Sequence, residues 1–217
     1  MQIGIYGGSF NPVHFGHVGL AKWVAEHTDL DEVWMMVSPN NPLKDSRELA
    51  DEQVRLAGVQ KAIEGIPHVV ASDFEFHLPR PSYTANTLRA LVAAYPQHTF
   101  SLIIGEDNLR ILPRWREWEY IVSHYRIFVY PRRGARSGQW AVVSGQLPDN
   151  AQIIMLEGAP YFDISSTEIR AFNSASLRVG KEKTNIFFKT FVYIKSFLYL
   201  CSAKENHITL TIKITQL

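Results

Sequence analysis

Two glycines and two histidines near the N-terminus form the pattern best suited to phosphate binding. An apolar run leads into Gly7-Gly8-Ser9-Phe10-Asn11-Pro12-Val13-His14-Phe15-Gly16-His17. Glycines let the backbone approach a ligand closely, and the helix expected next presents free N–H groups and its positive dipole end. His14 and His17 can share one face of that helix. The pattern indicates imidazoles that donate hydrogen bonds to a polyphosphate. A strand–turn–helix corner with incidental histidines is the alternative.

A second cluster, Ile164-Ser165-Ser166-Thr167-Glu168-Ile169-Arg170, lies far downstream. Its first serine and its glutamate have the spacing of a capping box at a helix start. The same helix start would present N–H groups and the hydroxyls of Ser166 and Thr167 to an anion. Arg170 could return to that face and hold a phosphate through two N–H groups. The cap and the anion site are compatible, and the sequence leaves both open.

Residues between the two motifs offer contacts for the rest of a nucleotide. Lys44 follows a Pro-rich loop and either neutralises a phosphate or is simply exposed. Thr84 stands at an expected helix start, as a ligand contact or as a plain N-cap. Gly105 ends an apolar run, and Asp107 after it could accept hydrogen bonds from ribose hydroxyls. Trp115 either stacks on a planar heterocycle or packs in the core.

Short apolar runs alternate with helix-like segments, which predicts βαβ units and an α/β fold with a mostly parallel sheet flanked by helices. Such sheets bind ligands outside the carboxyl ends of their strands, so the loops after the first, second, fourth and fifth strands should converge. The spacing of Val54, Ala57 and Ala62 predicts the buried face of the second helix. The predicted strands are 2–6, 32–37, 68–71, 99–104, 126–130 and 152–156, and the predicted helices are 15–27, 51–64 and 84–95.

The composition is that of a globular protein. Of the 217 residues, 46% are hydrophobic and 20% are charged, which excludes a disordered, collagen-like or coiled-coil chain. The net charge of +1 argues against a strongly basic nucleic-acid-binding protein. The single cysteine, Cys201, cannot form an internal disulfide. The start of the chain lacks the features of a signal peptide, and no long apolar run suggests a membrane span, so a cytoplasmic protein is expected.

The two motifs resemble the signatures of the nucleotidyltransferase superfamily, in which a G-S-F-[DN]-P loop is followed by H-x-G-H and, much later, by I-S-S-T-x-I-R. The resemblance implies a Rossmann-like nucleotidyltransferase fold. It also implies that His14 and His17 bind the phosphates of ATP and stabilise the leaving pyrophosphate. Ser166, Thr167 and Arg170 would complete the triphosphate site.

The stretches between these motifs resemble, more narrowly, the nicotinate mononucleotide adenylyltransferase family. In that family the lysine contacts a substrate phosphate, the threonine and tryptophan hold the pyridine ring and its carboxylate, and the G-x-D segment and first loop hold adenosine. The family often has Arg-Pro-Gly after the fifth strand, where this chain has Arg132-Arg133-Gly134, and of the two arginines Arg132 is the closer match. The implied residues are, for catalysis, His14, His17, Lys44 and Arg170; for ATP, Gly7, Gly8, Ser9, Phe10, Gly105, Asp107, Ser166 and Thr167; and for the mononucleotide, Asn11, Lys44, Thr84, Trp115 and Arg132.

The resemblance implies adenylyl transfer from ATP to nicotinate mononucleotide, which gives deamido-NAD and pyrophosphate. The mononucleotide phosphate is already a nucleophile at neutral pH, so catalysis must come from positioning two polyanions and stabilising the leaving group. Mg²⁺ is expected on the ATP phosphates and not in an acidic cage. Nucleic acid and membrane are not expected as partners. The alternatives are nicotinamide mononucleotide or another phosphate as substrate, and nucleotide binding without turnover.

The C-terminal part of the chain differs in composition from the rest. Residues 1–170 carry 15 basic and 19 acidic side chains (net −4), whereas residues 171–217 carry 7 and 2 (net +5). A catalytic domain over 1–172 is therefore expected, followed by an atypical tail over 173–217. The tail is either the product of a frameshift or a natural divergent segment with an amphipathic helix.

One stretch of that tail, 208–214, alternates apolar and polar residues like a strand without an obvious partner, which is an aggregation hazard. Truncation after Leu200 is therefore expected to preserve turnover and to improve solubility. Turnover assays and thermal unfolding of the truncated protein test this expectation. Loss of activity or of cooperative unfolding would show that the tail belongs to the working fold.

Overall fold

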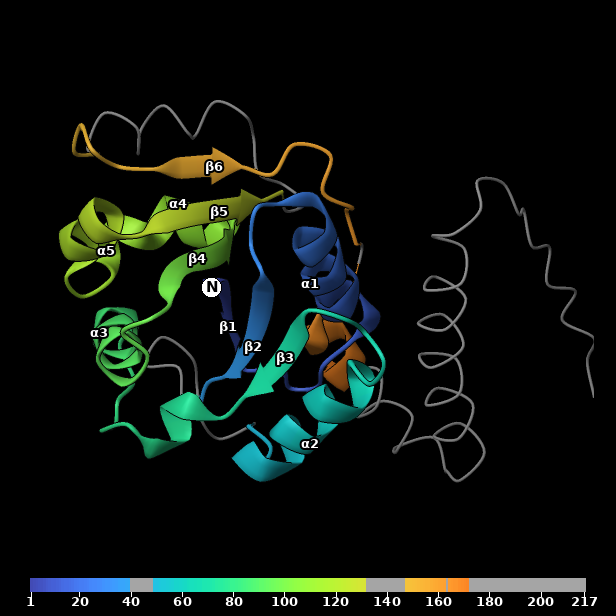
Figure 1. The fold of residues 1–217 in the computed structure, drawn as a ribbon. Helices are drawn as coiled ribbons and strands as arrows, with labels where there is room; N and C mark the ends of the chain where they lie inside the picture. The colour runs from blue at the N-terminus through green and yellow to red at the C-terminus, as the bar shows by residue number, and fades with distance from the viewer. Residues whose placement is uncertain (40–48, 132–146, 163, 172–217) are drawn as a thin grey trace, which may run out of the picture. The chain divides into compact units, whose positions relative to one another are not determined.

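The computed structural model describes residues 1–39, 49–131, 147–162 and 164–171, and within these ranges six strands form one sheet. Every neighbouring pair of strands is parallel, as the alternating sequence pattern predicts. The order across the sheet is β3-β2-β1-β4-β5-β6 (Figure 1). The strands are β1 (Gln2–Gly8), β2 (Glu32–Val37), β3 (Val69–Ser72), β4 (Thr99–Gly105), β5 (Arg126–Tyr130) and β6 (Ile153–Met155).

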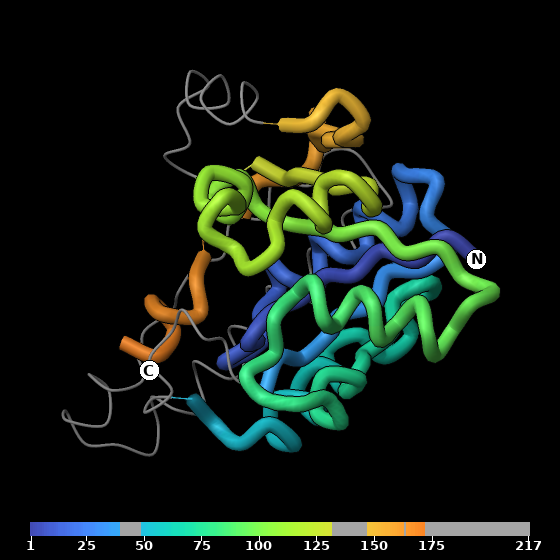
Figure 2. The backbone as a smooth tube through the Cα atoms, turned by 90° about the vertical axis from the view of Figure 1, so that its left-hand side faces the viewer, coloured from blue at the N-terminus to red at the C-terminus, as the bar shows by residue number. Residues whose placement is uncertain are grey.

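Helices cover both faces of the sheet (Figures 1 and 2). The apolar sides of α1 and α2 pack into one core cluster, and those of α3, α4 and α5 pack into the other. No helix in the described ranges is long and apolar enough to span a membrane. The helices are α1 (Phe15–His27), α2 (Glu52–Ala62), α3 (Thr84–Ala94), α4 (Glu106–Ile111) and α5 (Trp118–His124), with 3₁₀ turns η2 (Phe74–His77) and η3 (Leu112–Arg114).

The strands supply both cores because successive side chains point to opposite faces of a sheet. In β2, Val33 and Met35 face the cluster with α1 and α2, whereas Met36 faces the cluster with α3 to α5. Ile3 and Ile5 of β1 face that second cluster too. These five side chains are nearly or fully buried. Burial on both faces explains why the strands read as near-continuous apolar runs in the sequence.

The side on which successive strands are added to the sheet reverses between the two central strands, β1 and β4. The chain moves outward from β1 to β2 and β3 on one side, and it returns to β4, β5 and β6 on the other. The switch point between β1 and β4 opens a crevice at the carboxyl ends of the strands. Gly7 and Gly8 end β1 there, and Tyr130 ends β5 opposite Gly105 of β4. The strand ends predicted to converge therefore meet at this edge.

The predicted buried face of α2 is wrong at Val54 and Ala57, whereas Ala62 is partly buried and packs against the core. Val54 is 66% exposed and Ala57 is exposed, whereas Leu56 and Val59 are buried. The larger side chains of Leu56 and Val59 bury more apolar surface than alanines do, so they turn the helix to their own side. This rotation also buries Arg55, which is 3% exposed.

The short helices between β4 and β5 were not predicted from the sequence. α4 and α5 have only six and seven residues. Such lengths give fewer than two full turns of apolar repeat, which is too little for a periodicity signal. The expected tail, residues 173–217, lies outside the described residues.

Candidate active site

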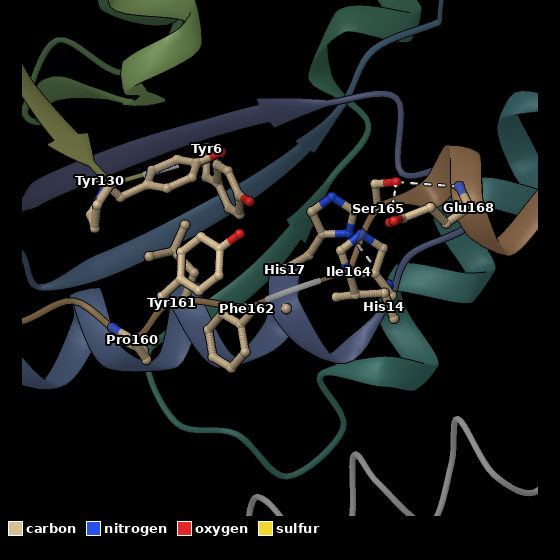
Figure 3. A pocket seen from close by; sticks show the side chains of 13 residues that line it. Tyr6, His14, His17, Tyr130, Pro160, Tyr161, Phe162, Ile164, Ser165 and Glu168 are labelled. Carbon is tan, nitrogen blue, oxygen red and sulfur yellow. Dashed lines mark hydrogen bonds between the residues drawn. The ribbon is translucent and has the colours of Figure 1, made fainter. Parts of the chain in front are cut away.

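The first cavity, of about 370 Å³, lies beside the N-terminus of α1 (Figure 3). Its walls come from the end of β1, the first turns of α1, the end of β5 and the segment around the second sequence motif. Segments far apart in the chain therefore meet here. The lining residues are Tyr6, His14, Gly16, His17, Leu20, Tyr130, Pro131, Pro160, Tyr161, Phe162, Ile164, Ser165 and Glu168.

The two motif histidines form a stacked pair at the start of α1. His14 is the N-cap residue, and His17 is in the first turn. Their ring centroids lie 3.6 Å apart with an interplanar angle of 25°. The backbone N–H of His14 donates to Nδ1 of His17 at 3.3 Å. Because Nδ1 accepts this hydrogen bond, Nε2 of a neutral His17 carries the proton and can donate to a ligand.

Glycines in α1 make room for the segment that carries the second motif. A β-carbon on Gly16 would lie 3.0 Å from Cβ of Phe162 and 3.1 Å from Cγ2 of Ile164. A β-carbon on Gly19 would lie 2.5 Å from the tip of the Phe162 ring. The glycine inside H-x-G-H therefore serves close packing as well as the helix start. It lets the C-terminal motif lie directly on α1.

A hydrogen bond also ties the second motif to the first loop. Ser166 donates its hydroxyl proton to the carbonyl oxygen of Pro12 at 2.9 Å. Residues 166–171 are helical, and the N–H of Glu168 donates to Oγ of Ser165, as a helix cap requires. The Glu168 carboxylate accepts from the Ser165 hydroxyl at 2.6 Å, in place of the backbone N–H expected in a full capping box. The predicted hydrogen bond from the helix backbone to Ser165 is therefore confirmed, and the reciprocal one from the glutamate to the backbone is replaced.

A second cavity, of about 380 Å³, lies between the carboxyl edge of the sheet and α3. Tyr6 and Tyr130 line both cavities, and their rings meet edge to face with centroids 5.9 Å apart. The two cavities therefore adjoin at this tyrosine pair. The other lining residues of the second cavity are Ile5, Gly7, Gly8, Met36, Ser38, Glu75, Ser82, Tyr83, Thr84, Thr87, Leu88, Leu102, Ile103, Ile104, Asn108, Arg114, Trp115 and Arg116.

Both residues expected to hold a pyridine ring, Thr84 and Trp115, line the second cavity. Thr84 is the first residue of α3, and the N-cap is Tyr83, so the plain N-cap interpretation of Thr84 is wrong. Trp115 also packs against the core, which confirms the packing interpretation of this indole, whereas its stacking on a planar ring stays a prediction. Two positive charges, Arg114 and Arg116, stand at the same cavity, and the Arg116 guanidinium lies 4.9 Å from the ring centre of Tyr83.

Some residues of the first loop line a cavity, and others are buried and hold the loop in place. Gly7 and Gly8 line the second cavity and not the first, and their expected contact with ATP stays a prediction. Phe10 is buried at φ 44°, in the left-handed region, and packs against Gly8 and His17. Asn11 is buried and accepts a hydrogen bond from the N–H of Ala50 at 3.3 Å.

Other predicted residues lie near the site without lining either cavity, or lie outside the described ranges. Gly105 ends β4 as the N-cap of α4, and Asp107 is in the first turn of that helix, while their neighbour Asn108 lines the second cavity. Lys44 and Arg132 lie outside the described residues. The remaining predicted residues, Ser9, Thr167 and Arg170, are described but line neither cavity.

A buried arginine that sequence reasoning missed holds two site loops together. The guanidinium of Arg55 donates to the carbonyl oxygens of Ser9 at 2.7 Å, Ser38 at 2.8 Å, Ala50 at 2.9 Å and Pro39 at 3.2 Å. Burial lowers the pKa of Arg55, and the nearby carboxylates of α2 raise it in part. An arginine remains charged under such a shift, so Arg55 also places a positive charge behind the first loop.

A buried carboxyl, Glu75 of η2, was missed as well. Glu75 is 8% exposed, lines the second cavity and accepts a hydrogen bond from the Thr87 hydroxyl at 2.8 Å. Burial raises its pKa, which the hydroxyls of Thr87 and Ser38 offset only in part. In the sequence this residue stands between Phe74 and Phe76 before a Pro-rich loop, and this pattern does not show that the acid itself is buried.

Comparison with known proteins agrees with this arrangement. Residues 5–172 match a family model described as cytidylyltransferase-like. The chain is 49% identical over 181 residues to a protein of Bacteroides fragilis named probable nicotinate-nucleotide adenylyltransferase, a match that covers 83% of this chain and 84% of that one. A protein of the same name from Flavobacterium johnsoniae is 45% identical, with 83% of this chain and 89% of that one covered.

Solved structures show the same fold. Plasmodium falciparum nicotinic acid mononucleotide adenylyltransferase complexed with NaAD superposes with a TM-score of 0.65 at 20% identity, covering 79% of this chain and 83% of that one. The Rossmann-like nucleotidyltransferase fold expected from the motifs is therefore confirmed. Together with the sequence matches, the two motifs and their meeting at α1 give one conclusion. The chain belongs to the cytidylyltransferase-like family and, within it, to the nicotinate-nucleotide adenylyltransferases.

Proposed function

We propose that this chain transfers the adenylyl group of ATP to the phosphate of nicotinate mononucleotide, which forms deamido-NAD and releases pyrophosphate. The observation that carries the proposal is the pair of cavities that adjoin at Tyr6 and Tyr130. One presents the stacked histidines at a helix N-terminus, and the other presents an indole and two arginines. Two adjoining sites at the switch point of the sheet suit a reaction that joins two nucleotides.

The first cavity would hold the triphosphate. The N-terminus of α1 offers free N–H groups and a positive dipole end, which favour an anion. His17 would donate from Nε2, because its Nδ1 is held by the N–H of His14. A donor fixed in this way needs no reorganisation when charge develops on the leaving pyrophosphate. The Lys44 and Arg170 roles implied by the family, and those of Ser166 and Thr167, belong to the same proposed site.

The second cavity would hold the mononucleotide. The Trp115 ring offers a stacking surface for the pyridine, and Arg114 and Arg116 offer positive charge to its carboxylate or phosphate. The nucleophile is the mononucleotide phosphate, which is ionised at neutral pH, so no protein base is required. Catalysis then rests on positioning and on stabilising the leaving group.

The divalent ion fits as part of the substrate. The described residues contain no group of three or more His, Cys, Asp or Glu side chains placed to hold a metal ion. Mg²⁺ is therefore proposed to enter bound to the phosphates of ATP, with the remaining ligands from water. No step is assigned to a metal held by the protein. A cytoplasmic location is part of the same proposal.

Turnover with each mononucleotide tests this function. Purified protein is given MgATP with nicotinate mononucleotide or with nicotinamide mononucleotide, and dinucleotide and pyrophosphate are measured. The expected result is faster dinucleotide formation from the nicotinate form. Faster turnover of the nicotinamide form would identify the amide as the substrate. A thermal shift with ATP but no product from either mononucleotide would indicate a nucleotide-binding module and overturn the proposal.

Replacement of Trp115 by alanine is expected to weaken binding of nicotinate mononucleotide by about tenfold, because a stacking surface of the second cavity is lost. The dissociation constant of ATP should change little. Isothermal titration of each ligand measures both effects. Trp118→Ala is the matched control, because Trp118 packs against the same core without lining a cavity. Equal loss of affinity for both nucleotides would show that Trp115 acts only in packing.

A further inference from the structure

Three buried polar atoms of the second cavity's residues have no hydrogen-bond partner among the described residues. They are Oε2 of Glu75, Oγ of Ser82 and Nε1 of Trp115, and each is shielded from solvent. They come from η2, from the loop before α3 and from the end of η3. A buried polar atom without a partner costs free energy. Three of them around one cavity indicate a polar ligand that completes their hydrogen bonds.

Glu75 is the acid among the three and is set firmly in place. It is 8% exposed, so more than nine-tenths of the residue is buried. Its Oε1 accepts from the Thr87 hydroxyl at 2.8 Å, which fixes the carboxyl against α3. Its other oxygen, Oε2, has no hydrogen bond of acceptable geometry, although the Ser38 hydroxyl is close enough to help lower the pKa of Glu75. A ribose hydroxyl that reaches Oε2 would approach it from the second cavity, which Glu75 lines.

The chemistry of the mononucleotide decides which of its groups can meet Glu75. The phosphate and the ring carboxylate are anions that only accept hydrogen bonds, and they suit the indole N–H of Trp115 and the guanidinium of Arg114 or Arg116. The ribose hydroxyls are the hydrogen-bond donors of nicotinate mononucleotide. A carboxyl retains an acceptor oxygen whether or not it is protonated. The ribose is therefore the partner that fits Glu75.

We propose that Glu75 contacts the mononucleotide directly and that its carboxyl accepts a hydrogen bond from a ribose hydroxyl. This inference rests on the proposed function and adds a residue that neither the motifs nor the family resemblance assigned. The contact would distinguish a ribonucleotide from a deoxyribonucleotide in the second cavity. It would also fix the sugar from which the attacking phosphate extends, so it bears on alignment of the nucleophile.

A cycle that combines protein and ligand changes tests the contact. The dissociation constants of nicotinate mononucleotide and of its 2′-deoxy and 3′-deoxy forms are measured for the wild type, Glu75→Ala and Glu75→Gln. Glu75→Ala should weaken the parent ligand about tenfold or more and leave ATP within about twofold. One deoxy form should bind the wild type similarly weakly, yet lose little further affinity in the alanine variant. Glu75→Gln should lose less, because its amide oxygen still accepts.

An exposed glutamate provides the control. Glu64→Ala removes an exposed acid at the end of α2 and should change neither affinity. Additive losses with both deoxy forms would overturn the inference, and so would equal weakening of ATP and mononucleotide. If Glu75→Ala fails to fold, the same ligand series on Glu75→Gln decides: a smaller loss for one deoxy form than for the parent ligand supports the contact, and equal losses for all three ligands overturn it. A wild type that binds no nicotinate mononucleotide overturns the proposed function as well, whereas additive losses in an active wild type overturn this inference alone.

Discussion

Replacement of His17 by alanine is expected to lower kcat by about 10²-fold or more while the fold stays intact. The reason is local. Nε2 of His17 is the donor that the His14 backbone orients toward the first cavity, and this donor would meet the charge that builds on pyrophosphate. The side chain is not part of the main apolar core, so its loss should cost little stability. Steady-state turnover and thermal unfolding measure the two effects.

His27→Ala is the matched control for this prediction. His27 ends the same helix, is exposed and stacks on Trp23, away from both cavities. The control should retain normal kcat. His17→Gln should fall between the two, because the glutamine side chain keeps an N–H donor. Near-normal turnover of a folded His17→Ala protein would remove His17 from the reaction and leave the histidine stack as a packing feature.

Replacement of Arg55 by methionine is expected to lower the free energy of unfolding by about 2–4 kcal/mol. Methionine roughly fills the space but cannot donate to the carbonyls of Ser9, Ser38, Pro39 and Ala50. Buried carbonyls that lose a partner keep their desolvation cost. The loop after β1 would also lose its anchor, so kcat/KM should fall about tenfold or more. Urea unfolding and turnover are the measurements.

An exposed arginine gives the comparison. Arg80 pairs with Glu52 at 2.8 Å, but its side chain is 51% exposed, so Arg80→Met should change stability by about 1 kcal/mol or less. Arg55→Lys should recover only part of the loss, because an ammonium cannot span carbonyls that a planar guanidinium bridges. If Arg55→Met unfolds like the wild type, the carbonyl contacts do not stabilise the site loops.

Much of the fold was predictable because buried parallel strands read as apolar runs bounded by turn residues. α1, β2 and β5 have the predicted bounds. β1 begins at the predicted residue and ends at Gly8 instead of Tyr6. The α2 face was wrong at Val54 and Ala57 because Leu56 and Val59 are buried instead, and the sequence does not show that Arg55 beside them can be buried by backbone carbonyls. The short α4 and α5 were missed because so few residues give no clear periodicity.

The site was predictable where its residues lie together in one sequence motif. The spacing of His14 and His17 on one helix start already indicated a shared ligand, and their rings stack. Residues brought together by tertiary structure were not visible in the same way. Glu75 and Arg55 are charged residues with apolar neighbours in the sequence, and only the fold shows that they are buried themselves. The roles of Lys44 and Arg132 stay predictions, because both lie outside the described residues.

The central claim is that the adenylyl group passes directly from ATP to nicotinate mononucleotide. A single-turnover reaction with ATP labelled on its α-phosphate tests it most directly, with nucleotides and protein separated at each time point. We expect the label to move from ATP to deamido-NAD in one step, with one pyrophosphate released per dinucleotide and no label on the protein. Label that accumulates on the protein, or label released as AMP without dinucleotide, would contradict it.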